Sequence, residues 1–170
     1  MRILILGIGN PILTDDAVGI LVARQLRGIG VDVEELAVGG LSLLDYMVGY
    51  DKVIVVDAVK RTGAHSDLPG EENMKGDIIP PGTVSVLHPH EIERALHASC
   101  IHDVSFSEAL KVGEYLFPDG MPSEIICVGI EVEDTETFSE TPTDAVMAAI
   151  PRAVALVKKI VHDFKFPRRY

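Results

Sequence analysis

The chain has 170 residues and a formal net charge of −11, and apolar residues make up 47% of it. This length and apolar content allow one substantial core, so we expect a single domain over residues 1–170. The acidic charge argues against a broad nucleic-acid surface, because phosphates would be repelled. No apolar run of about 18 residues and no signal-type cleavage site occurs, so we expect a cytoplasmic protein that does not cross a membrane.

The first stretch, Ile3 to Gly19, joins an apolar run to a helical pattern. Ile3 to Leu6 predicts a buried parallel strand, and a glycine-rich turn follows it. Apolar residues then recur at helical spacing from Val18 to Leu26. Two adjacent carboxylates, Asp15 and Asp16, are thereby delivered to the carboxyl edge of the first strand, where open α/β sheets place their ligands.

Asp15 and Asp16 also have a purely structural interpretation. Thr14 can act as the N-cap of the following helix, and acidic residues in a first helical turn are stabilised by the helix dipole by about 0.3–1 kcal/mol. In that interpretation the two aspartates begin a helix and have no chemical role.

The rest of the chain alternates predicted strands and helices. Strands are predicted at Val31 to Leu36, Lys52 to Asp57, Thr83 to Leu87 and Ile125 to Ile130, and helices at Leu41 to Val48, His90 to Leu96, Ser105 to Tyr115 and Thr141 to Asp163. Pro151 either kinks the last helix or restarts it. Residues 61–82 are rich in Gly and Pro and predict a long exposed loop. The alternation indicates an α/β fold with a mostly parallel, twisted, five-stranded sheet and helices on both faces.

Asp57 ends the clearest predicted strand, KVIVVD. An ionised carboxylate at a buried strand end is costly unless it is paired, bound to a metal or open to a cleft. The structural alternative is a side chain that caps the following turn. If the first and third strands are neighbours, their ends lie about 5 Å apart, and Asp57 approaches the Asp15–Asp16 turn. Carboxylates so close require a cation or a shared proton.

His102 precedes the predicted helix at Ser105. A helix N-terminus disfavours the protonated ring, and the neutral imidazole is the form that binds a metal. Two carboxylates and one imidazole suit a divalent transition ion that keeps open coordination positions. Cys100 and Cys127 form no CxxC pair, so neither a zinc site nor a disulfide scaffold is indicated.

With Asp16, Asp57 and His102 considered together, the sequence resembles the hydrogenase maturation endopeptidases, which process the large subunit of nickel-iron hydrogenases. The resemblance rests on ILGIGNPILTDDAVG, LLDYMVGYDKVIVVDAV, IHDVSFSEAL and the tail after VGIE. The family's metal-contacting positions fall on these three residues. Many members have Glu at the position of Asp16, and Ala17 stands where Gly is often found.

The resemblance implies a cytoplasmic endopeptidase that removes a C-terminal extension from a nickel-iron hydrogenase large-subunit precursor after nickel insertion. Asp16, Asp57 and His102 would complete the coordination of nickel that the substrate supplies, with no permanent organic cofactor. A metal-polarised carbonyl with Asp16 or Asp57 assisting a water is a chemically reasonable route to cleavage. We expect a monomer.

Other protein classes share parts of this pattern. A phosphoacceptor receiver domain also combines an acidic pair with an aspartate on the third strand and binds magnesium, but here the pair follows a GIGNPILT turn and no lysine follows the fifth strand. Peptidyl-tRNA hydrolase shares the GxGNP opening, but the arginine-histidine-asparagine sequence expected after it is missing. A dinucleotide-binding turn would need the third glycine of GxGxxG. A non-enzymatic metal sensor or chaperone stays open.

Overall fold

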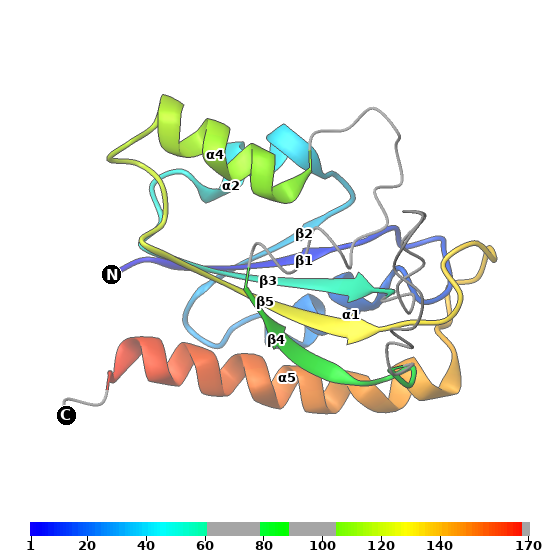
Figure 1. The fold of residues 1–170 in the computed structure, drawn as a ribbon. Coiled ribbons are helices and arrows are strands. Elements are labelled where there is room, and N and C mark those ends of the chain that lie inside the picture. Colours follow the sequence, from blue (N-terminus) through cyan, green and yellow to red (C-terminus); the bar gives the residue numbers. More distant parts are fainter. Residues whose placement is uncertain (61–78, 89–104, 168–170) are drawn as a thin grey trace, which may run out of the picture.

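A five-stranded sheet forms the centre of the fold (Figure 1). The computed structural model describes residues 1–60, 79–88 and 105–167 of the chain. The strands are β1 (Ile3–Ile8), β2 (Asp32–Leu36), β3 (Lys52–Val59), β4 (Val84–Leu87) and β5 (Glu124–Glu131). They lie in the order β2-β1-β3-β5-β4, and β4 runs antiparallel to β5 while the other neighbours are parallel. The predicted mostly parallel α/β sheet is confirmed.

Helices cover both faces of this sheet, as predicted (Figure 1). On one face lie α1 (Val18–Leu26) and α5 (Asp144–Lys165), and on the other lie η1 (Gly40–Leu43), α2 (Leu44–Met47) and α4 (Phe106–Leu116). Pro151 does not restart the last helix, because α5 is continuous through it. Within the described part of the chain, no helix is long and apolar enough to cross a membrane.

The central strands are apolar on both sides because helices cover both sides. In β1, Ile3 and Ile5 pack toward α1 and α5, whereas Leu4 and Leu6 pack toward α2 and α4. All four side chains are buried. Each buried aliphatic side chain of this kind stabilises the fold by about 1.5–3 kcal/mol. The continuous apolar runs in the sequence follow from this two-sided burial.

Helix α1 crosses the sheet at Gly19 with no room for a side chain. A Cβ at Gly19 would lie 2.2 Å from the carbonyl oxygen of Ile8 and 2.4 Å from that of Val56. Both distances are far below ordinary van der Waals contact, and both contacts are to backbone. Gly19 therefore sets how closely α1, and the turn before it, lie against the carboxyl ends of β1 and β3.

Replacing Gly19 by Ala is expected to lower the free energy of unfolding by about 1–3 kcal/mol, because the helix must move away from the two strands. Urea denaturation measures this effect. Gly39→Ala is the matched control, since a Cβ there meets nothing within 4 Å and the backbone φ is −138°. If the two variants lose the same free energy of unfolding, the close approach of α1 to the strands is not the reason that position 19 requires glycine.

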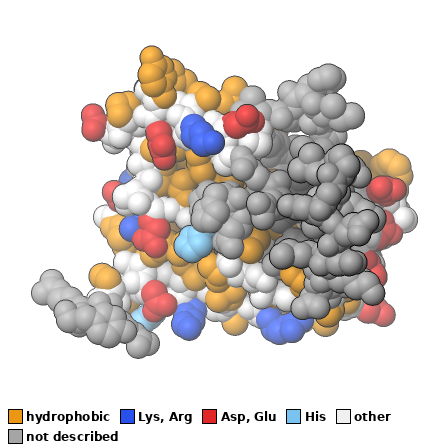
Figure 2. Space-filling view, viewed as in Figure 1, with side chains coloured by type: hydrophobic (Ala, Val, Ile, Leu, Met, Phe, Trp, Pro, Cys, Tyr) orange, Lys and Arg blue, Asp and Glu red, His pale blue; other side chains and the backbone are white. Residues whose placement is uncertain are grey.

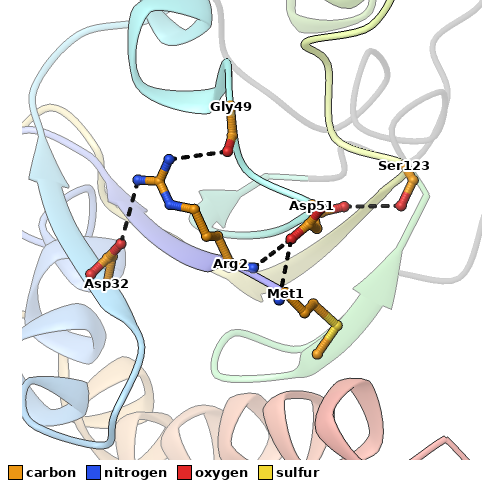
Figure 3. Close-up of polar contacts among 6 residues, drawn as sticks. All are labelled: Met1, Arg2, Asp32, Gly49, Asp51 and Ser123. Carbon is orange, nitrogen blue, oxygen red and sulfur yellow. Dashed lines mark hydrogen bonds and ion pairs between the residues drawn. The ribbon is translucent and has the colours of Figure 1, made fainter.

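A separate set of contacts holds the amino ends of β1 and β3 (Figure 3). The Arg2 guanidinium donates to the carbonyl of Gly49 at 3.1 Å and lies 4.3 Å from the centre of the Tyr50 ring. The carboxylate of Asp51 accepts the Arg2 backbone N–H and lies 3.8 Å from the amino group of Met1. These contacts lie at the edge of the sheet opposite to the predicted catalytic carboxylates.

Several predictions fall partly or wholly outside the described residues. The 61–82 loop is described only from residue 79, and the helix predicted at His90 to Leu96 is not among the described residues. The predicted helix after His102 forms as α4, and Ser105 is its N-cap. The Ser105 hydroxyl accepts the Glu108 N–H, and the Glu108 carboxylate accepts the Ser105 N–H.

Candidate active site

The neighbouring strands β1 and β3 bring two of the predicted site residues together. Parallel pairing aligns Gly7 with Val56, which places the turn after β1 beside Asp57. The strand β3 continues to Val59, two residues beyond the predicted end, so Asp57 lies within the strand. Because side chains alternate along a strand, Asp57 lies on the same face as buried Val55, the face that α4 covers.

The turn after β1 folds back on itself and thereby positions Asp16. At Gly9, with φ at +150°, a Cβ would lie 1.9 Å from the carbonyl oxygen of Asp16, so only glycine fits there. The backbone N–H of Asn10 donates to Oδ2 of Asp16 at 2.8 Å. The Asp16 carboxylate is half-buried. The glycine-rich turn thus fixes the Asp16 carboxylate near Asp57.

The expected helix-capping role of Thr14 and helix-start role of the Asp15–Asp16 pair are wrong. Helix α1 begins at Val18 with Ala17 at its N-cap, and its first turn contains no acidic residue. Thr14 does not cap this helix, because its hydroxyl donates to the carbonyl of Thr137 at 2.7 Å.

Asp15 and Asp16 have different environments although they are adjacent. Asp15 is fully buried, with 0% of its surface exposed. Its carboxylate accepts the Thr143 N–H at 2.7 Å, the Thr143 hydroxyl at 3.2 Å, the Asp134 N–H at 3.1 Å and the Glu133 N–H at 3.3 Å. These bonds tie the turn after β1 to the loop between β5 and α5. Asp15 therefore holds the turn in place, whereas the half-buried Asp16 carboxylate lies near Asp57.

Asp57 carries an electrostatic cost in this position. Its burial raises the pKa of its carboxyl well above the ordinary value, and the nearby charge of Asp16 raises it further. The N–H of Ala58, 2.8 Å from Oδ1, acts in the opposite direction but does not offset these effects. Two carboxylates that disfavour each other's charge in this way would be stabilised by a shared proton or a cation.

The raised pKa of Asp57 predicts a pH dependence of stability. Since the folded state favours the protonated form, the stability that Asp57 contributes is present at low pH and is lost as pH rises from the ordinary value of 3.8 through the raised pKa. Asp57→Asn stays neutral and keeps an oxygen for the Ala58 N–H, so we expect it to raise the free energy of unfolding at neutral pH. Urea denaturation from about pH 4 to pH 8 measures this. If Asp57→Asn is less stable than wild type at neutral pH, the pKa of Asp57 is not raised in the folded protein.

Cys127 lies near Asp57 but is not suited to nucleophilic catalysis. The residue is buried in the core that also contains Val55 and Phe106. Burial raises the pKa of its thiol strongly, and the charge of Asp57 raises it further. The reactive thiolate is therefore disfavoured, in agreement with the absence of a recognisable cysteine-protease motif around it.

The third predicted ligand, His102, lies outside the described residues. Residues 1–60, 79–88 and 105–167 contain no group of three His, Cys, Asp or Glu side chains arranged to hold a metal ion. Among the residues described, the structure brings together Asp16 and Asp57, which offer oxygen ligands. An ion bound there would keep coordination positions for other donors.

Comparison with known proteins identifies the relatives of this chain. The model of the HycI family, described as "Hydrogenase maturation protease", matches residues 76–160. "Hydrogenase 2 maturation protease" of Escherichia coli K12 is 29% identical, and the match covers 96% of this chain and all of that protein. "Protein FrxA" of Pyrococcus furiosus is 30% identical, with 88% and 97% covered.

A solved structure supports the fold independently. The hydrogenase maturating endopeptidase HybD of E. coli superposes with a TM-score of 0.72 at 24% identity, covering 96% of this chain and 93% of that one. The comparisons do not favour the receiver-domain alternative. The family model and the sequence relatives lead to one conclusion: the chain belongs to the hydrogenase maturation protease family and is a peptidase.

Proposed function

We propose that this peptidase removes the C-terminal extension of a nickel-iron hydrogenase large-subunit precursor after nickel insertion, with the substrate-bound nickel as the recognition element. The observation that carries the proposal is the pair Asp16 and Asp57 at the carboxyl edge of β1 and β3. The turn around Gly9 holds one carboxylate, and burial disfavours the charge of the other. A cation brought by the substrate would relieve that cost.

In this proposal Asp16, Asp57 and His102 complete the coordination of the nickel. Two oxygen donors and one imidazole nitrogen suit a divalent transition ion. The chain then needs no permanent organic cofactor, and the metal arrives with its correct substrate. Asp16 or Asp57 would assist cleavage by accepting a proton from the attacking water.

The partner is inferred from the family and from the site. A relative in E. coli bears the name "Hydrogenase 2 maturation protease". For this chain we propose a hydrogenase large-subunit precursor as the substrate, the cytoplasm as the place of action and a monomer as the active form.

The test measures the intact mass of a hydrogenase large-subunit precursor after incubation with the purified protein. We expect loss of a C-terminal peptide from the nickel-loaded precursor and not from the nickel-free one. His102→Ala should slow this loss by about 100-fold or more if His102 is a ligand. His162→Ala, which changes an exposed histidine on α5, is the control.

Each failure of this experiment has a distinct meaning. If wild-type protein leaves both precursor forms intact, the proposed substrate is wrong. If it processes both forms at one rate, nickel is not the recognition element. If His102→Ala processes the nickel-loaded precursor as fast as His162→Ala does, His102 is not in the site.

A further inference from the structure

Two exposed apolar side chains stand beside the candidate active site. Phe138 is 77% exposed and Ile12 is 52% exposed. They come from segments that pair with each other, because Leu13 and Phe138 form an antiparallel bridge and the Ser139 N–H donates to the Ile12 carbonyl at 3.1 Å. We call Ile12 and Phe138 the apolar lip.

Hydrogen bonds hold the backbone of the apolar lip on both sides of Phe138. Before Phe138, the Thr137 N–H donates to Asp134 Oδ1 at 2.9 Å, and the Thr137 carbonyl accepts the Thr14 N–H at 3.0 Å. After it, the Ser139 hydroxyl accepts the Thr141 N–H at 3.1 Å. An exposed aromatic ring on a backbone fixed in this way is preorganised for contact, so binding costs little ordering of the chain.

The apolar lip is continuous with the carboxylates. Asn10 connects them, because its N–H donates to Asp16 Oδ2 at 2.8 Å while its side-chain oxygen accepts the Ile12 N–H at 3.2 Å. Asp15 joins the same turn to Thr143 at the start of α5. The apolar lip and the Asp16 carboxylate therefore belong to one hydrogen-bonded turn.

The surroundings of the apolar lip are acidic. Residues 133–140 contain four acidic residues that are at least partly exposed, and no Lys or Arg. Lys60 brings one positive charge to this loop, where its ammonium group donates to the Glu133 carbonyl at 3.1 Å. Figure 2 shows hydrophobic and acidic side chains together at the right-hand end of the molecule, where Figure 1 places the loop between β5 and α5. Such a surface complements a positively charged chain.

We infer that the apolar lip docks an extended segment of the hydrogenase precursor, with apolar side chains against Phe138 and Ile12 and with Lys or Arg side chains near the acids of residues 133–140. This inference rests on the proposed function. It adds that the protein also recognises a segment of the precursor chain in addition to the nickel. Aromatic side chains are enriched among the residues that dominate interfaces, and Phe138 is the natural anchor.

The test compares kcat and KM for processing of the nickel-loaded precursor by wild type, Phe138→Ser and Ile12→Ser. We expect Phe138→Ser to raise KM about tenfold and Ile12→Ser to raise it about threefold, with kcat within about twofold of wild type. The urea midpoints should not change, because both side chains are exposed. Phe166→Ser is the matched control, since Phe166 is also 66% exposed but lies at the C-terminal end of α5.

The contribution of the acidic residues to docking is tested separately, by the salt dependence of KM. Glu136→Gln should raise KM about two- to fivefold at low salt, and the difference from wild type should disappear at about 1 M salt, where exposed charges are screened. An unchanged KM at low salt would remove the acidic residues from the docking surface.

The outcomes separate this inference from the proposed function. If wild type processes the precursor and Phe138→Ser matches Phe166→Ser, the apolar lip does not dock substrate, and the proposed function stands. A loss in kcat with unchanged KM also overturns docking. If wild type dimerises in sedimentation and Phe138→Ser is monomeric with normal KM, a second copy covers the lip. If wild type processes no precursor, both proposals fail.

Discussion

Asp57→Asn is expected to slow processing of the nickel-loaded hydrogenase precursor by about 100- to 10,000-fold. The amide cannot accept a proton from water, and it binds a divalent ion more weakly than a carboxylate does. The same substitution should stabilise the fold at neutral pH, because burial and Asp16 raise the pKa of Asp57 and make its charged form costly. Initial rates from intact mass and urea denaturation on one preparation measure both effects.

Opposite changes in activity and stability would rule out misfolding as the cause of the lost activity. Asp51→Asn is the control, because Asp51 lies just before the same strand at the opposite edge of the sheet (Figure 3). We expect this variant to process precursor within about twofold of wild type. An Asp57→Asn protein that keeps a third or more of the wild-type rate would exclude Asp57 from the chemistry.

Asp15→Ala is expected to lower the free energy of unfolding by about 3–5 kcal/mol. The substitution leaves the N–H groups of Glu133, Asp134 and Thr143 without the carboxylate that now accepts them. Because Asp15 is fully buried, water cannot simply replace it. The turn that carries Asp16 would lose its attachment to α5, so activity should fall together with stability.

Asp163→Ala is the control for Asp15→Ala, since Asp163 is exposed near the end of α5 and should change stability by no more than about 0.5 kcal/mol. Thermal or urea unfolding measures both variants. If Asp15→Ala is as stable as Asp163→Ala, the buried hydrogen bonds of Asp15 do not hold the loop between β5 and α5 in place.

Local patterns in the sequence were sufficient to predict the sheet and most of its helices. The apolar run of β3 and the helical spacing of apolar residues in α1 and α5 indicate which side chains are buried. These patterns are local, so they can be recognised in the sequence. Boundaries were less accurate: β3 extends past Asp57 to Val59, because Ala58 and Val59 are also buried. From the sequence alone, a polar residue such as Asp57 looks the same whether the strand ends at it or continues beyond it.

The roles of Asp15 and Asp16 could not be separated from the sequence. Two adjacent aspartates before a helix look alike, and the partners of Asp15 lie 118 to 128 positions later in the chain. The apolar lip was missed for the same reason, since the segments that carry Ile12 and Phe138 pair only after the fold forms. The proximity of Asp16 and Asp57 was predictable because parallel neighbouring strands bring their carboxyl ends to one edge.

The most direct test of the site is the nickel K-edge X-ray absorption spectrum of the nickel-loaded precursor, frozen rapidly after mixing with this protein. We expect additional oxygen or nitrogen ligands on the nickel with wild type, and no such gain with the Asp16→Asn, Asp57→Asn double variant. Native mass spectrometry confirms that a complex forms. A complex with wild-type protein whose nickel spectrum equals that of the precursor alone would contradict the claim that these carboxylates bind the substrate's metal.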